Sequence, residues 1–154
     1  MKIKFNYTIV FALLFINACN QKTIFEKREI FANNSWENNK AIEFNFEIPK
    51  ENKKYDLIIP ITNTKEFEKT SLNLLFNLIS NGEERFFYKS IPIKNEQNAF
   101  IGKKIGNNFE TLFYYMKSMK FKRKGKYTLS LKITMPQVVT IGIAEIGLIV
   151  KESK

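Results

Sequence analysis

The sequence predicts an all-β fold, an antiparallel β-sandwich of the jelly-roll type with about seven or eight strands. Apolar and polar residues alternate in several short segments, which is the period of a strand with one face in a core. Turn-forming residues separate these segments, and Asn81-Gly82 is the strongest hairpin signal among them. No segment shows convincing helical spacing, so the pattern favours strands throughout.

The N-terminus differs from the rest of the chain. Two lysines precede an apolar run over 9–16, which is too short for a spanning helix and is typical of a signal-peptide core. The run ends in Ile16-Asn17-Ala18-Cys19, which has the pattern of a lipobox. We therefore predict a lipoprotein signal peptide over residues 1–18. Cys19 then becomes the first mature residue and carries acyl chains such as palmitate.

The remaining chain is the size of one domain. Residues 19–23 form a lipidated polar tether, and residues 24–154 are long enough to bury a core of their own. Cys19 is the only cysteine, so its lipidation leaves no thiol for a disulfide. The alternative is a buried cysteine in a cytosolic protein, and the position of the apolar run at the extreme N-terminus argues against it.

The first predicted strands lie before residue 63. A weak strand is predicted over 23–31, and a clearly alternating one over 40–48. The segment over 54–62 is more continuously apolar, which indicates a buried strand. Pro60 lies inside it and favours an edge position or a bulge, because proline has no N–H to donate to a ladder.

The later strands include a hairpin and one ambiguous segment. Segments over 72–80 and 84–91 flank the Asn-Gly turn. The segment over 126–135 alternates, and an apolar strand over 143–151 closes the chain. Four apolar residues within 109–116 have helical spacing, but the dense aromatic run there also suits a strand, which is the assignment we predict.

The apolar phase of these strands predicts the core. The predicted core residues are Phe44, Phe46, Leu129, Leu131 and Leu148. Gly147 lies within the last apolar strand, where glycine indicates a bulge or a close backbone approach. Gly142 is expected to adopt a positive φ before that strand.

The residue inventory excludes several kinds of site. The chain has no histidine and a single aspartate, Asp56, so a Ser-His-Asp hydrolase, a histidine metal centre and an EF-hand loop are not predicted. A glycosidase needs only two carboxylates. The candidate pairs are Glu43 with Glu47, Glu66 with Glu68, and Glu83 with Glu84. Each pair lies on a polar strand face or near a turn, so we predict no catalytic residue, metal or cofactor.

The densest charge cluster is a basic segment near residue 120. Its members are Lys117, Lys120, Lys122, Arg123, Lys124 and Lys126. Gly125 within it indicates a turn, so the cations are expected to splay around a loop. The loop could dock on anionic phospholipid, on lipopolysaccharide or on an acidic protein. The alternative is an ordinary solvated loop in a chain of net charge +10.

Aromatic residues make up 14% of the chain. Trp36 could stack on a sugar from a loop, although a tryptophan there more often closes one end of a sandwich core. Aromatic runs over 86–88 and 113–115 place rings on both faces of their strands. One face must be core, and the other is available to a partner.

An ordered set of segments carries a family resemblance. The set comprises the lipobox at Cys19, Phe31-Ala32-Asn33-Asn34-Ser35-Trp36, Phe44-Asn45-Phe46, Tyr55-Asp56-Leu57-Ile58-Ile59-Pro60-Ile61-Thr62-Asn63, Leu72-Asn73-Leu74, Gly102, Gly106, Gly125-Lys126-Tyr127 and Gly142-Ile143-Ala144-Glu145-Ile146-Gly147-Leu148-Ile149-Val150. The chain thereby resembles the gliding-motility lipoprotein GldH family of the Bacteroidetes over nearly its whole mature length. The resemblance implies a noncatalytic lipoprotein of the gliding machinery, in the same envelope system as type IX secretion.

Three functions follow from these observations. The first is a component that docks with other gliding or secretion proteins of the envelope, and a broad apolar patch without a cleft favours it. The alternative is a carbohydrate-binding surface lipoprotein, which an exposed coplanar pair of rings in a groove favours. A third is a glycosidase-like enzyme, which two carboxylates facing across a cleft favour.

The expected location is the cell envelope, with the membrane as a partner through the lipid at Cys19. The segment after Cys19 lacks an acidic cluster, which favours the periplasmic face of the outer or inner membrane. Export makes nucleic acid an unlikely ligand despite the basic pI.

Overall fold

The structure is a computed structural model that describes residues 21–153. Cys19 and the predicted signal peptide over 1–18 lie outside the described residues. The strands are β1 Thr23–Ile30, β2 Ser35–Glu37, β3 Ile42–Ile48, β4 Lys54–Asn63, β5 Ser71–Ser80, β6 Glu83–Pro92, β7 Lys103–Ile105, β8 Asn108–Lys120, β9 Gly125–Ile133, β10 Val139–Ile141 and β11 Ile143–Glu152. A single 3-10 turn, η1, spans Ala32–Asn34. The described part of the chain holds no long apolar helix of the kind that crosses a membrane.

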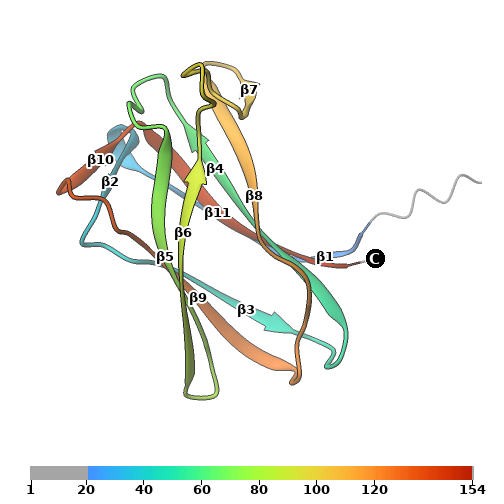
Figure 1. The fold of residues 1–154 in the computed structure, drawn as a ribbon. Helices are drawn as coiled ribbons and strands as arrows, with labels where there is room; N and C mark the ends of the chain where they lie inside the picture. The colour runs from blue at the N-terminus through green and yellow to red at the C-terminus, as the bar shows by residue number, and fades with distance from the viewer. Residues whose placement is uncertain (1–20, 154) are drawn as a thin grey trace, which may run out of the picture.

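Two antiparallel sheets form the sandwich (Figure 1). The larger sheet has the order β1-β11-β4-β8-β7, and the smaller one has the order β3-β9-β5-β6. If the three-residue strands β2, β7 and β10 are left out, the eight long strands of the described chain can be numbered 1 to 8 along the chain. In this numbering the larger sheet has the order 1-8-3-6 and the smaller sheet has the order 2-7-4-5. This is the order of a jelly roll, so the predicted fold class is confirmed.

Each strand predicted from the sequence is present. The ambiguous aromatic segment is the strand β8, and the Asn-Gly turn joins β5 to β6 with positive φ angles at Asn81 (50°) and Gly82 (78°), as a type I′ turn requires. The described residues hold three further strands of three residues each, β2, β7 and β10. These short strands raise the strand count above the predicted one.

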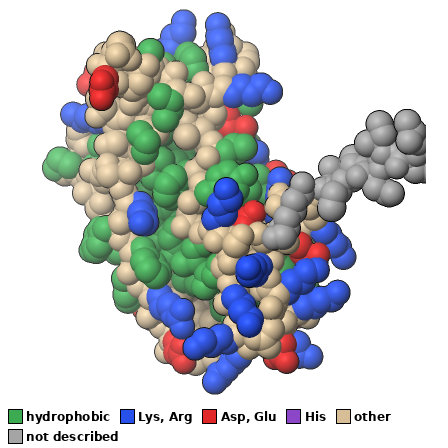
Figure 2. Space-filling view, turned by 45° about the vertical axis from the view of Figure 1, so that its right-hand side comes forward, with side chains coloured by type: hydrophobic (Ala, Val, Ile, Leu, Met, Phe, Trp, Pro, Cys, Tyr) green, Lys and Arg blue, Asp and Glu red, His purple; other side chains and the backbone are tan. Residues whose placement is uncertain are grey.

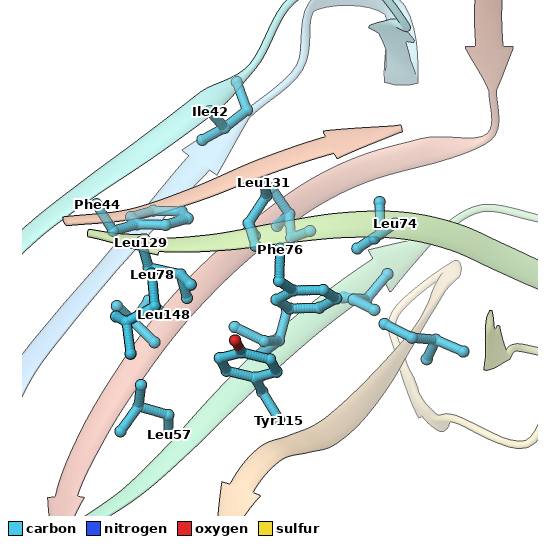
Figure 3. Close-up of a cluster of buried hydrophobic side chains, with 14 of the residues drawn as sticks. Ile42, Phe44, Leu57, Leu74, Phe76, Leu78, Tyr115, Leu129, Leu131 and Leu148 are labelled. Atoms are coloured by element: carbon cyan, nitrogen blue, oxygen red, sulfur yellow. The ribbon is translucent and has the colours of Figure 1, made fainter. Parts of the chain in front are cut away.

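The core lies between the two sheets and follows the predicted phase. Phe44, Phe46, Leu129, Leu131 and Leu148 are all buried. Phe44 and Leu129 are opposite each other in the β3–β9 ladder, and Figure 3 shows their side chains with Leu148 from the other sheet in one cluster. Alternating residues of both sheets therefore fill the interior, as expected of a sandwich.

The prediction for Pro60 was wrong, because β4 lies in the middle of the larger sheet. The ladder to β8 is regular from Ile58 to Asn63, including Pro60↔Leu112, and its register shifts lie between Tyr55 and Ile58. The ladder to β11 is interrupted at Pro60, between Ile61↔Ile146 and Ile58↔Ile149. The interruption accommodates a residue that has no N–H.

Gly147 makes room for that proline. A Cβ built on Gly147 would lie 3.0 Å from Pro60 Cγ and 2.8 Å from the carbonyl oxygen of Lys27. A side chain at this position would collide with both neighbouring strands. The predicted close backbone approach at Gly147 is therefore confirmed.

The first and last residues of the described chain lie at the same end of the sandwich, which we call the tether end. There β1 begins opposite the end of β11 (Thr23↔Lys151), and Lys54 of β4 is opposite Lys120 of β8. The β5–β6 turn lies at the same end, since the Ser80 hydroxyl contacts the Lys126 carbonyl. The connections over 64–70, 93–102 and 134–138 lie at the other end, the distal end.

Candidate functional site

The predicted basic segment lies on the surface of the tether end. Its six cations are all exposed, and among the described residues none of them has an acidic partner within ion-pair distance. The cations of the β8–β9 connection splay around Gly125, whose φ is 129°. The bends of this connection lie at Lys122 and Arg123, and Gly125 is the first residue of β9.

Lys117 is set apart from the other five cations. Its ammonium lies 5.7 Å from the centre of the Tyr114 ring, a cation–π distance. Lys117 therefore belongs to the aromatic side of β8, and the tether-end loop runs from Lys120 to Lys126.

The second surface is the open edge of the sandwich, which we define by the exposed apolar residues Phe86, Phe87, Tyr88, Leu112 and Tyr114. They lie on β6 and β8, and their exposed fractions are 56%, 38%, 70%, 50% and 48%. Figure 2 shows hydrophobic side chains gathered along the middle of the face that carries these strands. Phe86 and Tyr88 share the outer face of the smaller sheet with their partners Asn77 and Leu75. Leu112 and Tyr114 alternate with the inward-facing Phe113 and Tyr115, so they lie on the outer face of the larger sheet.

Both strands of the open edge have unpaired backbone. Within residues 21–153, β6 is the last strand of its sheet and pairs only with β5. β8 pairs with β7 only over Asn108–Glu110, so the remainder of its outer edge has no strand beside it in the described structure. Free N–H and C=O groups along an edge are a template for an added strand.

Packed rings support the open edge from beneath. Phe87 meets Tyr115 edge to face at 6.0 Å, and Tyr115 stacks on the buried Phe76 at 4.3 Å. Burial raises the pKa of Tyr115 well above its usual value and keeps its hydroxyl neutral. Phe87 therefore packs through Tyr115 against Phe76, in a stack of rings that joins the two sheets.

Trp36 does not form part of an exposed site. It is 1% exposed, stacks on Phe31 at 5.0 Å, and donates a hydrogen bond from Nε1 to the Lys40 carbonyl at 3.0 Å. The ring closes one end of the core and has no free face for a sugar, so the interpretation as an aromatic contact site was wrong.

Two of the glutamate pairs named from the sequence, Glu43 with Glu47 and Glu83 with Glu84, lie on exposed strand surfaces. Glu43 and Glu47 are exposed on one face of β3. They are four positions apart along the strand, about 13 Å, which is beyond the spacing of a glycosidase pair. Glu83 is in ion-pair contact with Arg85. Glu84 accepts a hydrogen bond from the Asn77 amide.

The pair Glu66 and Glu68 lies at the distal end. Both residues line an open hollow of about 530 Å³ with apolar residues of β10. No group of three or more residues able to ligate a metal occurs within residues 21–153.

Two further carboxylates meet at a cluster that the sequence did not reveal. Arg28 Nη1 lies 2.7 Å from Glu110 Oε1 and 2.6 Å from Glu145 Oε1. Burial opposes the charge of Arg28, yet its bonds to the two carboxylates raise its pKa further above the ordinary value. The cluster joins β1, β11 and β8 on the outside of the larger sheet, and its acids are occupied by the guanidinium.

A model of the GldH lipoprotein family matches residues 23–150. The chain belongs to the GldH lipoprotein family. It is therefore a gliding-motility lipoprotein with a lipid anchor in the cell envelope. The match spans both strands of the open edge and the tether-end loop, so these surfaces lie within the GldH domain.

The GldH assignment has support from a relative of similar length. The chain is 20% identical over 155 residues to the gliding motility lipoprotein GldH homolog of Christiangramia forsetii (strain DSM 17595 / CGMCC 1.15422 / KT0803), covering 96% of this chain and 94% of the relative.

Two solved structures show remote likeness to the GldH domain. Dimeric latent PorU from Porphyromonas gingivalis matches with a TM-score of 0.39 and 9% identity, over 86% of this chain and 13% of PorU. The infectious bursal disease virus Gx strain structure matches with a TM-score of 0.27 and 10% identity, over 86% and 35% of the two chains. Neither likeness carries a functional argument.

Proposed function

We propose that this chain is a noncatalytic docking component of the gliding-motility machinery associated with type IX secretion. The observation that carries the proposal is the open edge, where the free backbone of β6 carries the exposed rings of Phe86, Phe87 and Tyr88. Family membership indicates which machinery the chain belongs to, and the open edge is the surface through which we propose that it binds another protein of that machinery.

The occupant we propose for the open edge is an extended segment of another protein of that machinery. Such a segment would pair with the free backbone of β6 and cover the rings of Phe86 and Tyr88. Aromatic side chains supply much of the binding energy at protein interfaces, because they bury a large area with little loss of rotamer freedom. Lipid anchoring raises the effective concentration of the partners, so a modest interface suffices.

The experiment replaces the exposed rings in a gliding strain that lacks the chromosomal gene. The double variant Phe86→Ser/Tyr88→Ser is expected to fold, since both side chains are exposed, but to spread poorly and to lose its crosslink to a gliding or secretion protein. The control is Val138→Ser/Ile141→Ser, which removes exposed apolar side chains of the distal end and should spread as the wild type does.

Several results would contradict the proposal. Full spreading of the deletion strain with normal transport of surface adhesins would exclude a role in gliding. Normal spreading of the open-edge variant would show that the docking site lies elsewhere on the domain. Saturable glycan binding lost in the same variant would favour the carbohydrate-binding alternative, and glycan hydrolysis would exclude a noncatalytic role.

A further inference from the structure

The tether end carries more positive charge than the loop recognised in the sequence. Other segments add cations there from the residue before β1, the β3–β4 connection, the start of β4 and the end of β11: Lys22, Lys50, Lys53, Lys54 and Lys151. The acids at this end are fewer. Glu152 is in contact with Lys53, Asp56 is buried beneath the Ser118 amide, and Glu47, Glu51, Glu83 and Glu84 are exposed.

Two of the cations at this end lie opposite each other, and neither forms an ion pair with an acidic residue of the described chain. Lys54 and Lys120 are directly opposite in the β4–β8 ladder, and both are exposed. Within residues 21–153 neither has an acidic partner at ion-pair distance. Like charges at such positions destabilise a sheet, and a bound anion would relieve the repulsion.

The loop backbone that carries the cations is fixed in place. Phe121 is 2% exposed and packs edge to face against Tyr55 at 5.8 Å and Tyr127 at 4.9 Å. Its carbonyl accepts a hydrogen bond from the Asn52 amide at 2.8 Å. The Tyr127 hydroxyl donates to the Arg123 carbonyl at 2.8 Å. The ammonium groups therefore project from a preorganised platform.

A hollow lies between this platform and the β5–β6 turn. Its volume is about 290 Å³, and the cations that line it are Lys120, Lys122, Arg123 and Arg85. Ser80 and Asn81 of the turn add polar groups, and Glu83, held by Arg85, is its only carboxylate among the lining residues. A hollow of this charge and size suits a phosphate-bearing headgroup.

The predicted lipid anchor at Cys19 would place a membrane at this same end. Cys19 precedes Gln21, the first described residue, by two positions, and two residues span at most about 7 Å. The next residue is tied to the sandwich, because the Lys22 carbonyl accepts a hydrogen bond from the Glu152 amide at 2.9 Å. An acylated Cys19 would therefore hold the tether end close to the membrane surface.

We propose that the tether-end face binds the headgroups of anionic phospholipids in the membrane that holds the lipid anchor. The face comprises the platform from Lys120 to Lys126 together with Lys22 and Lys54. This inference goes beyond the proposed docking in the gliding machinery and does not depend on it, since the two use different surfaces. Each lysine near such a surface is expected to strengthen partition about fivefold.

The test uses the full mature chain with Cys19→Ser, so that binding to vesicles depends on the protein surface alone. Vesicles contain either phosphatidylcholine alone or phosphatidylcholine with about one third phosphatidylglycerol. The chain should sediment with the anionic vesicles only, and the binding should weaken as salt rises from about 0.05 to about 0.3 M. The variant Lys120→Gln/Lys122→Gln/Lys124→Gln should bind on the order of 100-fold more weakly.

The matched control is Lys65→Gln/Lys69→Gln/Lys104→Gln, which removes the same charge from exposed positions at the distal end. It should bind as the parent does, and circular dichroism should show that both variants are folded. Equal binding to neutral vesicles, or an equal loss in the control, would overturn the proposal. A third preparation adds lipopolysaccharide to phosphatidylcholine, and binding confined to it, or no binding to any vesicle, would also overturn the proposal.

Discussion

Phe121→Ala is the substitution that most directly tests whether the tether-end platform is preorganised. The ring is almost fully buried between Tyr55 and Tyr127, and truncation of a buried phenylalanine costs about 3–5 kcal/mol. Phe121 also lines the open hollow of about 290 Å³, so water can enter the space that the ring leaves. We therefore expect the lower end of the range, about 3 kcal/mol.

A loss of this size is readily measured. For a domain of this length, about 3 kcal/mol lowers Tm by about 10 °C, which calorimetry on the mature Cys19→Ser chain would detect. Phe121→Leu keeps most of the volume and should cost less than about 1.5 kcal/mol. Well below its melting temperature, the Phe121→Ala chain should also bind anionic vesicles more weakly than the Phe121→Leu chain. If Tm and vesicle binding both stay at the wild-type values, the ring does not hold the loop.

Three further predictions concern the core, one glycine and the anchor. Phe44→Ala should lower the free energy of unfolding by about 3–5 kcal/mol, and an unchanged Tm would show that the strand phase is wrong. Gly142→Ala should destabilise by about 2 kcal/mol or more, because φ is +87° and the added Cβ would lie 2.2 Å from the Phe67 amide nitrogen; Gly106→Ala, with positive φ but open space, should cost only about 1 kcal/mol. Cys19→Ser should release the protein from membranes or leave an uncleaved precursor, and mass spectrometry that finds an unacylated Cys19 in the wild-type mature protein would exclude lipidation.

The fold could be predicted because each long strand carries its own local signal. The alternation over 40–48 comes from a strand with one face in the core, and Asn81-Gly82 specifies its turn by backbone conformation alone. The three-residue strands are too short to show a period. Pro60 misled the prediction because the compensating residue, Gly147, lies far away in sequence and becomes its neighbour only in the folded sheet.

The candidate surfaces were predicted only in part for the same reason. The cations around Gly125 lie within ten residues of one another in the sequence, so their cluster could be predicted. Lys54 joins them only through the β4–β8 register. Likewise, the cluster of Arg28 with Glu110 and Glu145 joins residues from three strands. The exposure of Phe86 and Tyr88 depends on β6 being the last strand of its sheet, which alternation alone does not determine.

The two surfaces together predict an orientation that can be measured on the lipidated protein. If the tether end rests on the membrane, the strands run away from it, and β4 with its ten residues extends about 33 Å. Lipidation uses Cys19, so a probe can be attached to one introduced cysteine. In anionic vesicles with a contact quencher on the lipid headgroups, a fluorophore at Glu51→Cys of the tether end should be quenched, and one at Val138→Cys of the distal end should not. The open edge would then face sideways, along the membrane, where other anchored proteins can reach β6. Equal quenching at the two positions would mean that the domain lies on its side or tumbles on its tether, and the tether-end face would not be the membrane contact.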